Sequence, residues 1–230
     1  MSRKNKFGQP VGVALKGEFP RPRPPRSLMQ GRYCRLVPVA PEHAEDLFAA
    51  FARAEDGRDW TYLPLDPFTS VEECRAWIMQ AADSEDPLYY TVLDQDGRAV
   101  GWASYLRIDP AGGVIEVGWI NFSPLLQRTR ASTEAMYLMM ARAFDELGYR
   151  RYEWKCDSLN APSRRAADRL GFSYEGTFRQ ATHYKGRNRD TAWFSILDLE
   201  WPAQKARFEA WLDPGNFDED GRQRMPLTGR

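Results

Sequence analysis

The segment Gln127–Thr133 carries the residues best suited to bind an anion. It follows strand-like alternation at 114–122 and leads into helical spacing at 131–147, so it should form a strand-to-helix turn. The start of a helix presents unpaired backbone amides and the positive end of the helix dipole, which together bind phosphate. Arg128 and Arg130 add positive charge. Phosphate binding is therefore the chemistry expected here; the simpler interpretation is an ordinary helix start with two solvated arginines.

Predicted strands and helices place this turn inside one mixed domain. Alternating, β-branched and aromatic residues predict strands at 33–39, 88–94, 99–107, 114–122, 151–156, 172–182 and 191–199. Apolar residues at helical spacing predict helices at 41–54, 71–83, 131–147, 161–170 and 203–212. Ser70 followed by Glu73 predicts a capping box at the start of the second helix. The turns at 95–97 and 110–113 favour an antiparallel meander. The pattern is typical of an α+β fold with a mixed, largely antiparallel central sheet flanked by helices.

Composition and charge exclude several classes of protein. With 43% hydrophobic and 28% charged residues in 230, the chain is neither wholly disordered nor a fibrous rod. Thirty-two basic residues balance 32 acidic ones, so we expect no nucleic-acid or membrane partner drawn by a global field. No apolar run reaches the roughly 18 residues of a spanning helix, and no signal-peptide core follows the N-terminus, so we expect a cytoplasmic protein. The cysteines Cys34, Cys74 and Cys156 should be free thiols, and with two histidines beside them no metal site is expected.

The two ends of the chain differ from the middle. Residues 1–28 contain seven basic residues, one acidic residue and a proline cluster, which predicts an extended arm. No nucleic-acid-binding motif accompanies these charges, so we interpret the arm as solvated or laid over the parent domain. Residues 29–212 should form the domain. Residues 213–230 lose apolar periodicity and are predicted to be a tail.

Three short motifs follow one another between residues 127 and 177. The first comprises Gln127-Arg128-Thr129-Arg130-Ala131-Ser132 and the following Thr133-Glu134-Ala135. The second is Asn160-Ala161-Pro162-Ser163, and the third runs from Ala166 through Leu170-Gly171-Phe172 to Glu175-Gly176-Thr177. The first resembles the Q/R-x-x-G-x-G/A pyrophosphate loop of the GNAT acyltransferase superfamily. The others are similar to the N-x-x-S…LGF…EG run of its ribosomal-protein N-terminal serine/alanine acetyltransferase branch.

The resemblance covers roughly residues 32–199 and implies both a fold and an activity. It implies a sheet splayed between the fourth and fifth predicted strands. It further implies acetyl-CoA as donor, a primary amine as acceptor, and direct transfer in a ternary complex. The implied donor-binding residues are Gln127, Arg128, Thr129, Arg130, Ala131, Ser132 and Thr133 of the turn, with Asn160 as a side chain that orients CoA. Asparagine at a helix start is equally a common N-cap.

The sequence departs from the family pattern in two places. Arg130 stands at the loop glycine and Ser132 at the last small position; an arginine there keeps its amide in the cradle if its φ is negative. Between Glu116 and Pro124 there is one residue more than in commoner members. We interpret this residue as a β-bulge that leaves the amides near Asn121 or Phe122 free to hold the thioester carbonyl.

Two residues are candidates for proton transfer. Glu116 lies among apolar residues of a predicted strand, where partial burial would raise its pKa toward neutrality, so we predict that it is the general base. A solvent-facing glutamate with a water relay is the alternative. Ser163 corresponds, through the resemblance, to the residue that protonates the leaving thiolate. The tyrosine that many GNAT members use for this has no counterpart, because its position holds Ala167.

Candidate acceptor-binding residues come from two loops. Trp60 and Tyr62 lie between the first two predicted helices, and His183 and Tyr184 lie at the end of a predicted strand. Core packing is the alternative for the aromatic residues, and a structural role is the alternative for the histidine. The predicted function is acetyl transfer to a small amine or a protein N-terminus by a monomer or homodimer. The competing hypothesis is a catalytically lapsed CoA-binding or interaction module, suggested by Arg130 in place of glycine.

Overall fold

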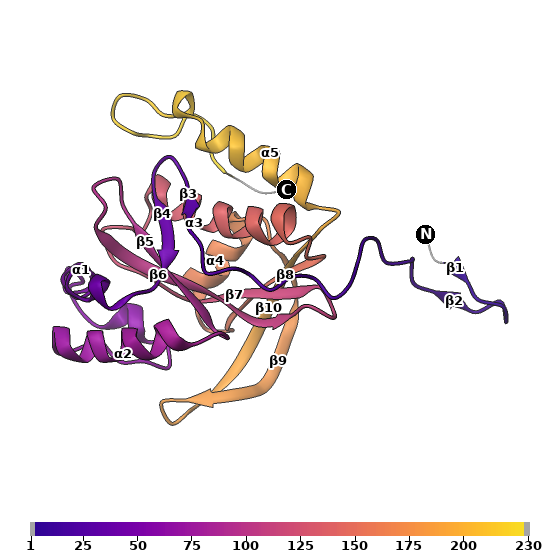
Figure 1. The fold of residues 1–230 in the computed structure, drawn as a ribbon, viewed down its shortest axis with the longest axis horizontal. Helices are drawn as coiled ribbons and strands as arrows, with labels where there is room; N and C mark the ends of the chain where they lie inside the picture. Colours follow the sequence, from indigo (N-terminus) through magenta and orange to yellow (C-terminus); the bar gives the residue numbers. More distant parts are fainter. Residues whose placement is uncertain (1–2, 228–230) are drawn as a thin grey trace.

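The computed structural model describes residues 3–227, which are organised around one eight-stranded sheet (Figure 1). The strands lie in the order β3-β4-β5-β6-β7-β8-β10-β9. Their bounds are β3 (Met29–Gln30), β4 (Arg35–Pro38), β5 (Leu88–Leu93), β6 (Ala99–Asp109), β7 (Val114–Phe122), β8 (Arg151–Asp157), β9 (Ser173–Tyr184) and β10 (Arg187–Leu197). Every neighbouring pair is antiparallel except β7 and β8. The predicted α+β class with a largely antiparallel sheet is confirmed.

The sheet opens between β7 and β8. Their parallel pairing runs from Val114 opposite Arg151 to Val117 opposite Trp154 and stops there, although both strands continue. On its other edge β7 carries a bulge, because Ser104 pairs with Gly118 while Trp102 pairs with Asn121. A bulge bends the strand that carries it and increases its twist, which separates β7 from β8. The predicted splay between these two strands is confirmed.

Helices cover both faces of the sheet and divide the core in two. On one face, α1 (Ala44–Phe51) and α2 (Val71–Asp83) bury Leu47 and Ile78 against Trp102. On the other face lie α3 (Arg130–Ala141), α4 (Ala161–Arg169) and α5 (Trp201–Leu212), with Met139 and Phe208 in the second cluster. Figure 1 shows α1 and α2 on the side of the sheet opposite α3 and α5.

Several predicted elements have different ends in the structure. The first predicted helix begins as a short 3₁₀ turn, η1 (Pro41–His43), before α1. The third continues beyond α3 as a π turn, η3 (Arg142–Glu146). Ser70 caps α2 as predicted, but Glu73 accepts from the amide of Thr69 instead of completing the box with Ser70. Two further 3₁₀ turns are η2 (Arg58–Trp60) and η4 (Pro214–Asn216).

Glu134 fixes α3 against the turn that joins β3 to β4. Its buried carboxylate accepts hydrogen bonds from the amides of Arg32, Tyr33 and Cys34 at 2.8, 2.6 and 2.9 Å. Three charge-assisted bonds compensate the loss of hydration of a buried carboxylate. The glutamate in Thr133-Glu134-Ala135 is therefore a structural anchor, which places the start of α3 beside the opened sheet.

The two ends of the described chain are placed differently: residues 3–11 lie outside the core, whereas Leu227 is buried in the same cluster as Phe208. The short strands β1 (Arg3–Lys4) and β2 (Pro10–Val11) form a hairpin that projects from the body (Figure 1). Residues 21–26 run along the domain, where Arg23 and Arg26 donate to the carbonyls of Glu85 and Ser84. Residues 213–227 fold back beside α5 instead of extending away. In residues 3–227 no helix is both long and apolar enough to span a membrane.

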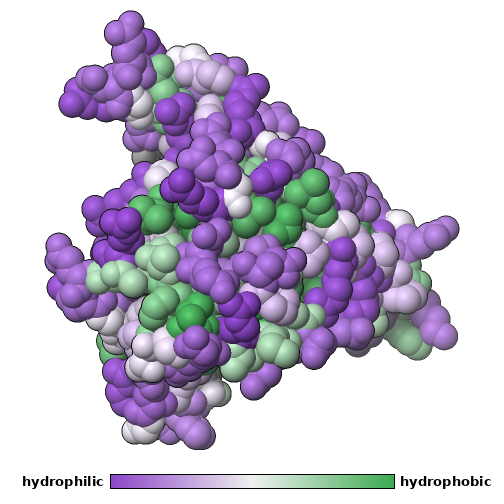
Figure 2. Space-filling view, turned by 60° about the vertical axis from the view of Figure 1, so that its left-hand side comes forward, coloured by the Kyte–Doolittle hydropathy of each residue, from purple (hydrophilic) through white to green (hydrophobic). Residues whose placement is uncertain are grey.

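The surface is mostly polar. The face turned forward in Figure 2 is largely hydrophilic, with apolar side chains gathered in patches across its middle. Apolar atoms contribute much of the surface of folded proteins, so patches of this kind are ordinary for a folded domain.

Candidate active site

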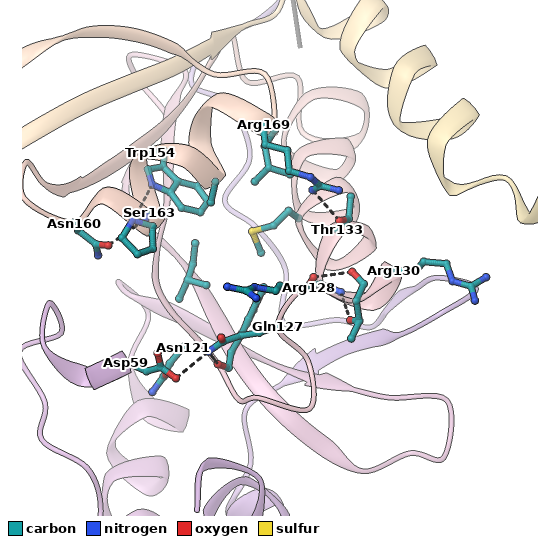
Figure 3. A pocket seen from close by; sticks show the side chains of 18 of the residues that line it. Asp59, Asn121, Gln127, Arg128, Arg130, Thr133, Trp154, Asn160, Ser163 and Arg169 are labelled. Carbon is teal, nitrogen blue, oxygen red and sulfur yellow. Dashed lines mark hydrogen bonds between the residues drawn. The ribbon is translucent and has the colours of Figure 1, made fainter. Parts of the chain in front are cut away.

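A cavity of about 1080 Å³ opens where β7 and β8 separate (Figure 3). Its walls come from the end of β7, the turn before α3, the start of α4, the loop after α1 and the C-terminal segment. The predicted donor-binding residues in its lining are Asn121, Phe122, Gln127, Arg128, Thr129, Arg130, Ser132, Thr133 and Asn160, together with the predicted acid Ser163. Ala131 packs instead against the core. The turn and the start of α4, 30 residues apart in sequence, therefore share one cavity.

The turn uses some of its amides internally. The amides of Leu126 and Gln127 both donate to the Ser123 carbonyl, and the Thr129 amide donates to Leu126. The Thr129 hydroxyl caps α3 by accepting from the Ser132 amide at 3.2 Å. Among the described residues no acceptor faces the amides of Arg128, Arg130 and Ala131. Fewer amides are thus available to a ligand than the seven-residue prediction implied.

The two arginines of the turn point in different directions. Arg128 has a φ of 61°, in the left-handed region, and its guanidinium lies toward the middle of the cavity (Figure 3). Arg130 is the first residue of α3 and is not among the residues with positive φ. Its guanidinium points away from Arg128 and lies over the rings of Phe217 and Tyr33, at 4.4 and 5.2 Å from their centroids. The glycine-like backbone position is therefore residue 128, not residue 130.

The β7 side of the cavity offers two hydrogen-bond donors. Asn121 is 3% exposed, and its Nδ2 has no partner among residues 3–227. The Ser123 amide donates to the Val100 carbonyl, and hydrogen bonding alternates along an antiparallel pair, so the Phe122 amide faces away from β6. A buried amide nitrogen without an acceptor costs free energy unless a ligand satisfies it. The donor set therefore fits a carbonyl oxygen of a ligand in the gap.

Asn160 and Ser163 form the start of α4. The Asn160 Oδ1 accepts from the Ser163 amide at 3.1 Å, so this residue is the N-cap. The Ser163 Oγ accepts from Trp154 Nε1 at 3.0 Å. Because the indole occupies an acceptor site of this oxygen, the serine can direct its own proton elsewhere. Trp154 thereby orients Ser163 at the cavity wall.

Glu116 lies outside the cavity lining. It is 3% exposed, and its carboxylate pairs with Lys155 at 2.8 Å and Arg107 at 2.9 Å. Lys155 also binds Glu153 at 2.7 Å. Burial raises the pKa of Glu116, while Lys155 and Arg107 act in the opposite direction. This carboxylate is held in an ion-pair network and is not among the residues that line the cavity.

The predicted acceptor residues occupy different surroundings. Tyr62 lines the cavity, and its hydroxyl donates to the Leu159 carbonyl at 3.1 Å. Trp60 is 3% exposed and packs edge-on against Phe51 and Phe68, so its ring supports the loop from inside. Its position matches the core-packing alternative.

His183 and Tyr184 lie in the β9–β10 hairpin rather than in the cavity lining. His183 is exposed and pairs across the hairpin with Asn188, while the Tyr184 hydroxyl donates to Asp157 at 2.7 Å. Lys185 ties this hairpin to the loop after α1 through the Trp60 carbonyl and Asp66. The structure thus brings both predicted acceptor loops to the same side.

Some cavity residues were not predicted from the sequence. Asp59 accepts from Gln127 Nε2 at 3.0 Å, and Arg169 donates to the Thr133 hydroxyl at 3.1 Å (Figure 3). Trp211 at the end of α5 and Phe217 beyond it contribute a further wall. No local pattern marks these residues, because each reaches the cavity through a tertiary contact. In residues 3–227 no group of three or more His, Cys, Asp or Glu side chains is placed to hold a metal ion.

Comparisons with known proteins agree with this geometry. A family described as the acetyltransferase (GNAT) domain matches residues 34–173. A solved GCN5-related N-acetyltransferase from Brucella melitensis is 49% identical with a TM-score of 0.90, covering 93% of this chain and 97% of that one. "Uncharacterized N-acetyltransferase p20" of Bacillus licheniformis is 27% identical over 61% of this chain and 80% of its own length. "Putative ribosomal N-acetyltransferase YdaF" of Bacillus subtilis (strain 168) is 29% identical over 48% of this chain and 60% of its own length.

Proposed function

This chain belongs to the GNAT acetyltransferase family, and on that premise we propose that it moves the acetyl group of acetyl-CoA to a primary amine by direct transfer in a ternary complex. The observation that carries the proposal is the cavity at the β7–β8 opening, with the unpaired Asn121 Nδ2 at its wall and Arg128 toward its middle. Acetyl-CoA supplies an activated acetyl thioester. The protein supplies binding, orientation and proton transfer.

The donor would be held by groups at two places in the cavity. The free amides of the turn and the Arg128 guanidinium suit the diphosphate, because phosphate oxygens accept strong charge-assisted hydrogen bonds. The Asn121 Nδ2 and the Phe122 amide suit the thioester carbonyl. Fixed donors at this oxygen would stabilise the negative charge that develops there during acyl transfer.

Two residues would handle protons. Ser163 lines the cavity, and Trp154 orients its hydroxyl. We therefore assign Ser163 the role of protonating the leaving thiolate. For the proton of the acceptor amine we assign Glu116, acting through water because its carboxylate is buried and does not line the cavity. Burial raises its pKa above the ordinary glutamate value, which makes this carboxylate a stronger base.

The acceptor we propose is a protein N-terminus or a small amine. The side of the cavity lined by Asp59 and Tyr62 would admit it, and the name of the Bacillus subtilis relative, a putative ribosomal N-acetyltransferase, supports a protein acceptor. We further propose a cytoplasmic monomer or homodimer without a nucleic-acid or membrane partner, in keeping with zero net charge.

The test is an acceptor panel assayed by release of CoA thiol. It should contain small amines, peptides with free N-termini and the same peptides N-terminally acetylated as matched controls. We expect thiol release only with free amines. Release that is equal for the free and acetylated peptides would contradict amine transfer.

A catalytically lapsed CoA-binding protein is the second candidate. The observation that favours it is the Glu116 carboxylate, which is committed to Lys155 and Arg107 outside the cavity. The same assay separates the candidates, because this one predicts CoA binding with no thiol release from any amine.

A further inference from the structure

The matched family domain ends at residue 173, yet one end of the cavity is built from residues that follow it. These are Trp211 at the end of α5 and Phe217, Gly221 and Gln223 in the segment beyond it. We refer to residues 211–223 as the C-terminal wall. The sequence gives no periodicity for most of this stretch, so its ordered position needs a physical cause.

Buried polar contacts fix the C-terminal wall in place. Asn216 is 5% exposed; its Nδ2 donates to the carbonyls of Trp211 and Met225 at 3.0 and 3.1 Å, and its Oδ1 accepts from the Met225 amide at 2.8 Å. Trp211 Nε1 donates to Gln223 Oε1 at 2.8 Å. A satisfied buried polar network holds one arrangement, so the wall is formed before a ligand arrives.

The wall also holds two guanidinium groups at this end of the cavity. Arg169 lies over the Trp211 ring at 5.0 Å from its centroid, and Arg130 lies over the Phe217 ring at 4.4 Å. Cation–π contacts of this kind position an arginine without neutralising it. The C-terminal wall therefore positions two arginine side chains in addition to lining one end of the cavity.

These arginines have no anionic partner within the described chain. No ion pair among residues 3–227 includes Arg128, Arg130 or Arg169. Partial desolvation and the nearby Arg207 lower the pKa of Arg169. Three guanidinium groups without an ion-pair partner, two of which lie over aromatic rings, fit a ligand that combines several phosphates with a flat base.

We propose that the C-terminal wall, with Arg130 and Arg169, binds the phosphorylated adenosine end of the donor. This inference rests on the proposed use of acetyl-CoA and adds a site from outside the matched family domain. The pantetheine arm would then extend from this end toward Asn121 and Ser163. The wall would contribute donor affinity and take no part in acetyl transfer.

The test is calorimetric titration with CoA and with adenosine 3′,5′-bisphosphate, which contains the nucleotide but no pantetheine. The variants are Arg169→Gln and Phe217→Ala, with Arg165→Ala as the matched control, since Arg165 is exposed on the same helix and lies outside the cavity lining. We expect Arg169→Gln to weaken binding of both probes about tenfold or more, the loss typical of a charge-assisted hydrogen bond. Phe217→Ala should weaken both probes in the same direction, and Arg165→Ala should leave both unchanged.

Two outcomes separate this inference from the proposed function. Wild-type affinity for CoA in both Arg169→Gln and a folded Phe217→Ala would overturn the nucleotide site while leaving CoA as the donor. If Phe217→Ala does not fold, Gln223→Ala, at an exposed residue of the same wall, takes its place. Failure of the wild-type protein to bind CoA at all would contradict the proposed donor itself, and this inference with it.

Discussion

The backbone of Arg128 combines strain with an exposed charge inside the cavity. A φ of 61° costs a non-glycine residue roughly 1 kcal/mol. Strained residues of this kind cluster at active sites and ligand-binding sites. We predict that Arg128→Gly raises Tm by about 2 °C because glycine adopts this φ freely. The same variant should bind CoA about tenfold more weakly because the guanidinium is gone.

Arg128→Ala is the matched control for that prediction. It removes the same charge but keeps a β-carbon at positive φ, so it should lose the same CoA affinity without the gain in Tm. Thermal denaturation and titration of both variants measure the two effects. Equal Tm values for the glycine and alanine variants would show that the backbone there is not strained.

Ser163 should affect chemistry more than binding. We predict that Ser163→Ala lowers kcat by about tenfold or more and changes KM for acetyl-CoA little, because the hydroxyl acts on charge that develops at the leaving sulfur. Steady-state kinetics on any acceptor found by the panel provide the measurement. An equal loss of affinity and turnover would instead make Ser163 a binding residue.

Glu116 gives the pH dependence of the proposed reaction. Burial raises its pKa, so activity on a slow acceptor should increase with pH through one ionisation above the ordinary glutamate range. We predict that Glu116→Gln abolishes this ionisation and lowers kcat by about 10²- to 10⁴-fold. Glu153→Gln is the control, because it disturbs the same Lys155 network and leaves Glu116 intact. An unchanged pH profile in Glu116→Gln would show that the amine loses its proton by another route.

At the scale of elements, an exposed ion pair joins β8 to β9. Arg151 binds Glu175, and the Ser195 hydroxyl donates to the same carboxylate at 2.7 Å. These contacts lower the pKa of Glu175 to about 2, with the Arg151 hydrogen bond as the largest cause. Because the folded pKa is depressed, the pair stabilises the fold above about pH 4.5, and this stability is lost as pH falls toward 2.

We predict that Glu175→Gln lowers the free energy of unfolding by about 1 kcal/mol at pH 7, a value reduced for solvent screening because the carboxylate is partly exposed. As pH falls toward 2 the difference between the variant and the wild type should shrink to zero. Urea denaturation at pH 7 and pH 2 is the measurement, with Glu72→Gln at an exposed position of α2 as control. A difference that persists at low pH would place the effect in packing rather than in charge.

Local signals explain which elements could be predicted from the sequence. The alternation of β5 to β7 and the Ser70 cap are properties of neighbouring residues, so the sequence alone predicts these features. The strand β3 has only two residues, and the Glu134 anchor depends on residues about 100 positions away, so local patterns predict neither feature. Sequence patterns therefore predict elements better than the contacts that position them.

The same distinction applies to the candidate site. The turn after β7 was predicted as an anion site from its helix start and its arginines, which are local features. The direction of Arg130 could not be predicted, because Tyr33 and Phe217 reach it from opposite ends of the chain. The ion pairs of Glu116 likewise join three strands.

At the scale of the whole molecule, the central claim is that the opened sheet forms one donor site for CoA in each chain. The most direct measurement is calorimetric titration of the wild-type protein with CoA, supported by its melting temperature in saturating ligand. We predict a stoichiometry of one and a rise in Tm of about 5–10 °C at 100 times the dissociation constant, which corresponds to about 2.7 kcal/mol of added stability. Absence of binding heat and an unchanged Tm at millimolar CoA would contradict the account.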